Sequence, residues 1–140
     1  MKHFLYDEKV KYNNGIHEIQ RDLALLEPIG IKSNKIIKPE LYISVQDKRK
    51  IDSLFYEHRI KENEKFITLA PGSVWFTKRF PEEKFAKLCD LLFAVNIKIF
   101  LIGGKKDKTI SDFIQNNSKN RNIINVTGNF SVMESAELIK

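Results

Sequence analysis

The chain has 140 residues, of which 42% are hydrophobic and 30% are charged, and its formal net charge is +6 at pH 7. This length and composition predict one globular domain with a real core and exclude an intrinsically disordered chain. The positive charge favours anionic partners, although a lysine-rich solvated surface accounts for it equally well. No apolar run approaches the ~18 residues of a membrane-spanning helix, and the start of the chain lacks the apolar stretch of a signal peptide. We therefore expect a cytoplasmic protein that touches a membrane only at its surface.

The first forty-odd residues carry few strong signals. Apolar residues recur at helical spacing between residues 16 and 26, and Pro28 with Gly30 ends that pattern. His17 lies on this helix, but no potential partner ligand is close in sequence, so a metal site there is disfavoured. Further on, Leu41, Ile43 and Val45 alternate with polar residues, which predicts a short strand or an edge segment.

Residues 46–59 form a candidate helix with a run of three basic residues, Lys48-Arg49-Lys50. Aromatic residues do not interleave with this run in a way that would stack nucleic-acid bases. The run therefore predicts a solvated helix face rather than a nucleic-acid surface.

Residues 65–140 alternate between strand-like and helix-like segments. The expected strands are 66–70, 97–102 and 123–126, and the expected helices begin at Pro81, after Asp107 and at Ser131. Alternation with short connections predicts a parallel sheet with right-handed crossovers, a Rossmann-like α/β fold. Cys89 is the only cysteine, which excludes an internal disulfide, and its place among apolar residues of the first helix predicts a buried thiol.

The loop after the first strand holds the densest group of polar and cationic residues. They are Gly72, Ser73, Thr77, Lys78 and Arg79. Glycine lets a ligand approach the backbone, the hydroxyls donate and accept hydrogen bonds, and the two cations attract negative charge. This combination predicts a site for an anion, in particular a phosphate group.

The other two strands also end in glycine turns, Gly103-Gly104 and Thr127-Gly128. Ligands of parallel sheets bind beyond the C-terminal ends of the strands, where all three turns would meet. A single glycine simply ends a strand, but three glycine turns on one edge favour a binding site. The chain has neither the P-loop pattern nor Gly-x-Gly-x-x-Gly, which disfavours a P-loop ATPase and a nicotinamide dehydrogenase.

Three segments follow one another at fixed spacings: Pro71-Gly72-Ser73 with Trp75 and 77–81, Leu101-Ile102-Gly103-Gly104 with Asp107, and Thr127-Gly128-Asn129-Phe130-Ser131. Taken in order, they resemble the motifs of glycosyltransferase family 9, the ADP-heptose:lipopolysaccharide heptosyltransferases. The family pattern usually reads Lys-Arg-Trp-Pro, and this chain has Phe80 in place of that Trp. The resemblance covers the second half of the chain well and the first half weakly.

The resemblance implies a role for each of four residues. Lys78 would bind the donor diphosphate and stabilise the charge of the leaving group, Ser73 would contact phosphate, Asp107 would hold the ribose hydroxyls and Phe130 would lie beside the adenine. The other expected donor-binding residues are Gly72, Thr77, Arg79, Gly103, Gly104 and Gly128. Each of the four also has a structural alternative: a solvated lysine, a serine in a turn, a helix-capping aspartate and a core phenylalanine.

The resemblance further implies a GT-B fold. Residues 1–60 would correspond to the end of the N-terminal domain and the linker, and residues 61–140 to part of the nucleotide-sugar-binding domain. The donor would be ADP-heptose or a similar nucleotide sugar, and the lipopolysaccharide core acceptor would bind to an N-terminal domain that has no counterpart here. The family's Asp-Thr-Gly-x-x-His motif is also absent, so we expect a fragment that is incomplete for catalysis alone.

No cofactor, metal or nucleic-acid partner is implied by the family, and the expected location is cytoplasmic, peripheral to the inner membrane. The alternative interpretation is a non-catalytic basic α/β domain that binds a protein partner or nucleic acid.

Overall fold

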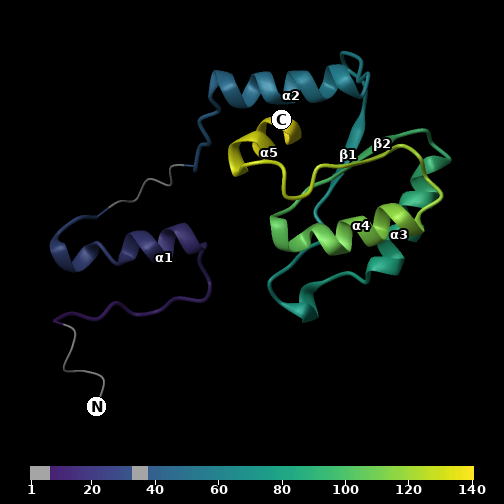
Figure 1. The fold of residues 1–140 in the computed structure, drawn as a ribbon. Helices are drawn as coiled ribbons and strands as arrows, with labels where there is room; N and C mark the ends of the chain where they lie inside the picture. The colour runs from purple at the N-terminus through teal and green to yellow at the C-terminus, as the bar shows by residue number, and fades with distance from the viewer. Residues whose placement is uncertain (1–6, 33–37) are drawn as a thin grey trace. The chain divides into compact units, whose positions relative to one another are not determined.

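The computed structural model describes residues 7–32 and 38–140, and the chain divides into two compact units, Met1–Glu40 and Leu41–Lys140 (Figure 1). The second unit takes in residues 41–60 together with 61–140. The division of function expected at residue 61, between linker and donor-binding domain, stays a prediction.

The first unit contains α1 (Glu18–Ala24) and the short 3-10 helix η2 (Glu27–Ile29). His17 caps α1, because its Nδ1 accepts a hydrogen bond of 3.2 Å from the backbone N–H of Ile19. Gly30 ends η2 with φ +82°, a left-handed conformation that glycine adopts without strain. The predicted helix is thus confirmed, and the structure gives His17 a capping role.

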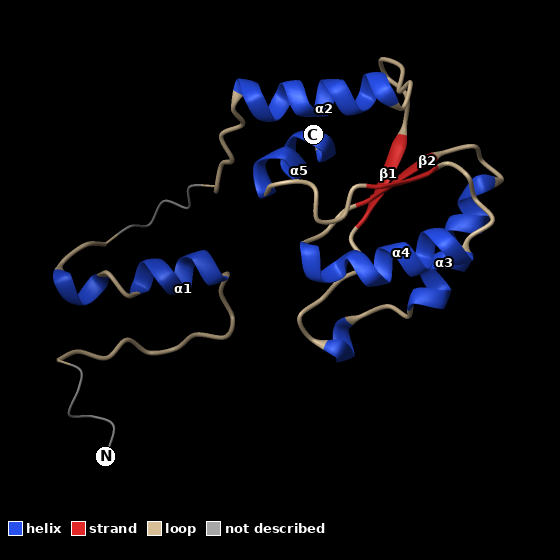
Figure 2. Cartoon of the chain, viewed as in Figure 1, coloured by secondary structure: helices blue, strands red, loops and turns tan. Residues whose placement is uncertain are grey.

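The second unit is an α/β fold. Its elements are α2 (Val45–Glu57), β1 (Phe66–Leu69), η3 (Phe76–Lys78), α3 (Glu82–Phe93), β2 (Lys98–Leu101), η4 (Lys105–Asp107), α4 (Lys108–Asn117), β3 (Ile123–Asn125) and α5 (Val132–Ile139). The strands form a parallel sheet in the order β1-β2-β3 (Figure 2). The alternation of parallel strands and helices that the sequence predicts is confirmed.

The central strand β2 is covered on both faces of the sheet. Ile99 and Leu101 are buried against Cys89 of α3 and Ile114 of α4. Phe100, between them, points to the other face, where α2 and α5 supply the packing (Figure 1). Continuous apolar sequence is what such a doubly covered strand requires, because its side chains alternate between two dry faces.

The strand expected at residues 41–45 does not form. Residues 38–44 have no regular secondary structure, and Val45 is already the first residue of α2. Ser44 caps that helix: its Oγ accepts from the Asp47 N–H at 3.1 Å, and Asp47 Oδ2 accepts from the Ser44 N–H at 2.9 Å. The Ser44 hydroxyl also donates to Asp47 Oδ2 at 2.6 Å, and this bond, with the one from the Ser44 N–H, lowers the pKa of the Asp47 carboxyl. The reciprocal cap outweighs the alternation of apolar residues, and the strand prediction was wrong.

Cys89 lies in the core between α3 and the sheet, as predicted, with no exposed surface. Burial, with a smaller effect of the neighbouring Asp90 carboxylate, raises the pKa of its thiol to about 11. The thiol is therefore protonated at neutral pH and out of reach of solvent.

We expect native Cys89 to resist alkylation by iodoacetamide at pH 8, because the thiolate is the reactive form and both burial and the raised pKa suppress it. Full labelling should appear only when the protein unfolds in denaturant. Mass spectrometry at increasing urea concentration measures this, and rapid labelling without denaturant would contradict the packing of α3.

Within the described ranges, no helix is long and apolar enough to cross a bilayer.

Candidate functional site

The turns that follow the three strands lie side by side at the C-terminal edge of the sheet. The Ile102 N–H, after β2, donates to the Leu69 carbonyl of β1 at 2.9 Å. The Gly128 N–H, after β3, donates to the Gly103 carbonyl, also at 2.9 Å. Backbone hydrogen bonds between neighbouring turns thus continue the sheet past its last regular residues and bring the predicted glycine turns together.

Asp107 lies at the junction of the first two turns. Its Oδ2 accepts a hydrogen bond of 2.9 Å from the Gly104 N–H. A Cβ atom added to Gly72 would overlap the same carboxylate, and one added to Gly103 would lie 2.9 Å from Oδ2. A side chain at either position would therefore have to displace the Asp107 carboxylate from its place beside the Gly104 N–H.

The capping role of Asp107 differs from the one expected. Its carboxylate does not cap α4, although Asp107 directly precedes that helix. It caps the turn before, η4, by binding the Gly104 N–H. Asp107 therefore caps its own turn while its carboxylate lies against Gly72 of the first turn, and its expected contact with ribose hydroxyls stays a prediction.

The third turn packs against η4. Gly128 has φ +82°, and a Cβ atom there would lie 3.2 Å from Cα of Lys105. Thr127, beside it, is buried, and its Oγ1 is 2.8 Å from the Ser111 Oγ of α4. The position of this turn is thus set by backbone contact on one side and by a buried hydroxyl pair on the other.

The loop between β1 and α3 is folded back on itself by Arg79. Its Nε donates to the Ser73 carbonyl at 2.8 Å, and Ser73 Oγ accepts from the Trp75 N–H at 3.3 Å. Phe80, the residue that replaces the family's Trp, packs edge-on against Phe85 of α3 with ring centroids 5.1 Å apart. Ser73 therefore has the turn role named as its structural alternative, while its carbonyl helps to fix the loop.

A cavity of about 720 Å³ opens where this loop faces η4. Gly72, Ser73 and Gly104 line it, together with three cationic residues and Asp107; the cations are Arg79, Lys105 and Lys106. Five residues that the sequence analysis expected to bind the donor thus line one cavity: Gly72, Ser73, Arg79, Gly104 and Asp107. The side chains around this cavity have a positive formal charge in sum.

Lys105 and Lys106 were not singled out from the sequence. Their signal was available, because they directly follow the Gly103-Gly104 turn at the end of a strand.

Lys78 and Thr77 lie outside this cavity. Thr77 lines a second cavity of about 490 Å³ on the loop, which it shares with Arg79 and Phe80. Lys78 ends η3 and is exposed to solvent, and it lines neither of these two cavities. Its assignment as the catalytic cation stays a prediction.

Phe130 is half-buried and packs against the core cluster of Ile51 and Phe100. This is the core role named as its structural alternative, and its place beside an adenine stays a prediction. Gly128, two residues earlier, belongs to the edge, so this segment links the edge to the α2–α5 face of the sheet.

Comparison with known proteins decides the family. The model of glycosyltransferase family 9 (heptosyltransferase) matches residues 1–140. The chain belongs to glycosyltransferase family 9. The resemblance drawn from the loop and turn motifs is thereby confirmed. A comparison with curated proteins gave no match.

Two solved structures show the same fold as this family 9 chain. A family 9 glycosyltransferase from Veillonella parvula is 21% identical, with a TM-score of 0.71 over 81% of this chain and 32% of that one. The ADP-heptose lipopolysaccharide heptosyltransferase II of E. coli is 20% identical, with a TM-score of 0.62 over 77% of this chain and 33% of that one. The GT-B-type fold is confirmed, and the chain spans about a third of the length of each relative.

Proposed function

We propose that this chain binds a nucleotide-sugar donor such as ADP-heptose at the glycine-turn edge, as part of a heptosyltransferase-like glycosyltransferase. One observation carries the proposal: the cavity lies at the glycine turns, and the three cations that line it outnumber its one carboxylate, Asp107. A diphosphate needs such an excess of positive charge, because its own negative charge must be neutralised. Family membership supports the same conclusion.

Each of the three cations can contribute to binding the leaving group. The Arg79 guanidinium donates one N–H to the Ser73 carbonyl and has four more donors, so it can fix the loop and bind an anion at the same time. Lys105 and Lys106 extend the positive charge along η4. As the bond to the sugar breaks, negative charge grows on the diphosphate, and fixed cations stabilise that charge. We assign Lys78, which lies on the same loop, to the same task of binding the diphosphate and stabilising its charge.

Transfer itself belongs to a protein of the relatives' length. The acceptor proposed for that protein is the lipopolysaccharide core, bound by an N-terminal domain, with the reaction at the cytoplasmic surface of the inner membrane. Asp107 is proposed to meet the ribose hydroxyls and Phe130 the adenine.

We expect ADP to raise the melting temperature of the chain by a few degrees when its concentration is about ten times the dissociation constant, equivalent to roughly 1.4 kcal/mol. Lys78→Ala should reduce the shift, and the double substitution of Lys105 and Lys106 by Ala should reduce it further. Lys87→Ala, which removes an exposed charge from α3, is the matched control. Differential scanning fluorimetry measures all four proteins, and no shift of the unaltered chain at millimolar ADP would contradict the proposal.

A further inference from the structure

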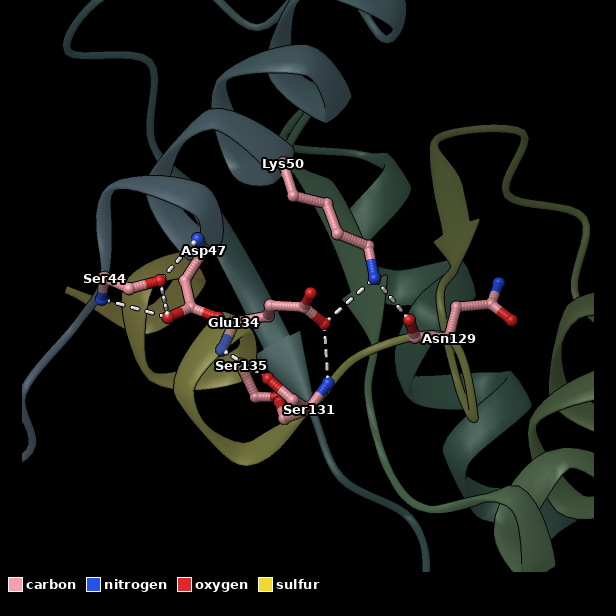
Figure 3. Close-up of polar contacts among 7 residues, drawn as sticks. All are labelled: Ser44, Asp47, Lys50, Asn129, Ser131, Glu134 and Ser135. Carbon is pink, nitrogen blue, oxygen red and sulfur yellow. Dashed lines mark hydrogen bonds and ion pairs between the residues drawn. The ribbon is translucent and has the colours of Figure 1, made fainter.

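Lys50 of α2 contacts the segment that connects the third glycine turn to helix α5. Lys50 Nζ donates to the Asn129 carbonyl at 2.9 Å and pairs with Glu134 Oε2 at 2.9 Å (Figure 3). These partners are 79 and 84 residues away along the chain. The Lys50 side chain is 46% exposed, as expected for a solvated helix face, but it also makes tertiary contacts, which the sequence did not indicate.

Glu134 carries the contact further into the segment. The oxygen that meets Lys50 also accepts from the Ser131 N–H at 2.6 Å, so the capping box of α5 and the ion pair share one atom (Figure 3). The Glu134 side chain is only 15% exposed. The bond from Ser131 and the Lys50 ammonium lower the pKa of this carboxyl, which therefore stays charged at neutral pH.

The ammonium also lies near an aromatic ring of the same segment. Lys50 Nζ is 5.1 Å from the centroid of Phe130, within the range of a cation–π contact. One charged group thus meets the carbonyl of residue 129, the ring of residue 130 and the carboxylate of residue 134. Just before them, the Gly128 and Asn129 N–H groups donate to Gly103 and Val126.

We propose that Lys50 is a positioning residue, which fixes residues 128–131 in the geometry that binds the nucleotide. This rests on the proposed function, because Phe130 is assigned there to the adenine and Gly128 belongs to the glycine-turn edge where the donor is proposed to bind. Lys50 acts through the backbone of Asn129 and touches no ligand itself. Charge-assisted hydrogen bonds of this kind are the stronger class, so losing the ammonium should loosen the turn rather than merely repack it.

The chain offers a matched control for this test. Lys48 lies in the same helix, and its Nζ pairs with Asp52 of that helix at 3.0 Å. Lys48→Met removes an ammonium and a salt bridge but no contact with the turn. Lys50→Met keeps the length of the side chain and removes the charge, and Lys50→Arg restores a cation that can reach both oxygens.

The first measurement is amide hydrogen exchange of the ligand-free chain, followed residue by residue by NMR. We expect the Gly128, Asn129 and Ser131 amides to exchange about five- to tenfold faster in Lys50→Met, a change within the range for loss of one charge-assisted hydrogen bond. Lys48→Met should leave them unchanged and Lys50→Arg should restore them. Equal exchange in Lys50→Met and the unaltered chain would overturn the proposal.

The second measurement is ADP affinity by calorimetry, at a temperature where every variant is folded. We expect Lys50→Met to weaken binding about three- to tenfold, Lys50→Arg to recover it and Lys48→Met to leave it unchanged. Faster exchange with unaltered affinity would make Lys50 a brace between helices and overturn the positioning role. If the unaltered chain binds no ADP, the proposed function fails, and the exchange rates alone decide whether Lys50 fixes the turn.

Discussion

Phe100→Ala should lower the free energy of unfolding by about 3–5 kcal/mol, the usual cost of removing a buried phenylalanine. Phe100 lies in the central strand with no exposed surface, and its ring meets those of Phe55 and Phe66 at centroid distances of 6.3 and 5.1 Å. The substitution leaves a cavity between β2 and the two helices α2 and α5, which cannot close around it without moving the sheet. Urea denaturation followed by circular dichroism measures the loss.

The control for this prediction is Leu91→Ala. Leu91 is also an apolar residue of the second unit, but it is 73% exposed on α3. Its truncation should change the unfolding free energy by no more than about 0.5 kcal/mol. Similar losses at residues 91 and 100 would show that the face of the sheet under α2 is not packed as described.

Gly128→Ala should lower the free energy of unfolding by about 1–3 kcal/mol and reduce ADP binding as well. Two effects add at this position. A Cβ at φ +82° is strained in itself, and it would press on Cα of Lys105 at 3.2 Å, a backbone atom that has no rotamer to change. The turn after β3 would then move away from η4 and widen the edge where the donor is proposed to bind.

Gly30→Ala separates the two effects. Gly30 also has φ +82°, but no atom of the residues that the structure describes lies within 4 Å of the Cβ that would be added there. It therefore carries the conformational strain without the contact, and its ADP affinity should not change. Thermal unfolding and calorimetry on both variants measure the difference, and equal effects at residues 30 and 128 would show that η4 does not press on the third turn.

The parts of this fold that depend on nearby residues could be predicted from the sequence. The capping box of α5 is one example, because Ser131 and Glu134 are three residues apart and satisfy each other. The apolar run of β2 is another, since a strand buried on both faces must read as continuous. The prediction for residues 41–45 was wrong because two local signals disagreed. The alternation of apolar residues indicated a strand, but the capping box at Ser44 begins a helix at Val45.

The candidate site was predictable as an edge but not in its internal contacts. Glycine turns after parallel strands indicated where a ligand would bind. The sequence could not show that the Asp107 carboxylate lies against Gly72, because that contact joins two different loops. The contacts of Lys50 were not predicted for the same reason, since its partners lie about 80 residues away in the chain. The spacing of apolar residues along the sequence shows which face of a helix or strand is buried. It does not show which charged residues of distant elements form an ion pair.

Because Asp107 packs against Gly72 and Gly103, the residue that is allowed at each of these three positions depends on the residues at the other two. A larger residue at either glycine would push the carboxylate away from the Gly104 N–H, and a shorter residue at 107 would leave that N–H without its acceptor. Substitutions that survive here should therefore arise in combination rather than one at a time. The loops of this edge would diversify slowly, even in a lineage whose sugar or acceptor has changed.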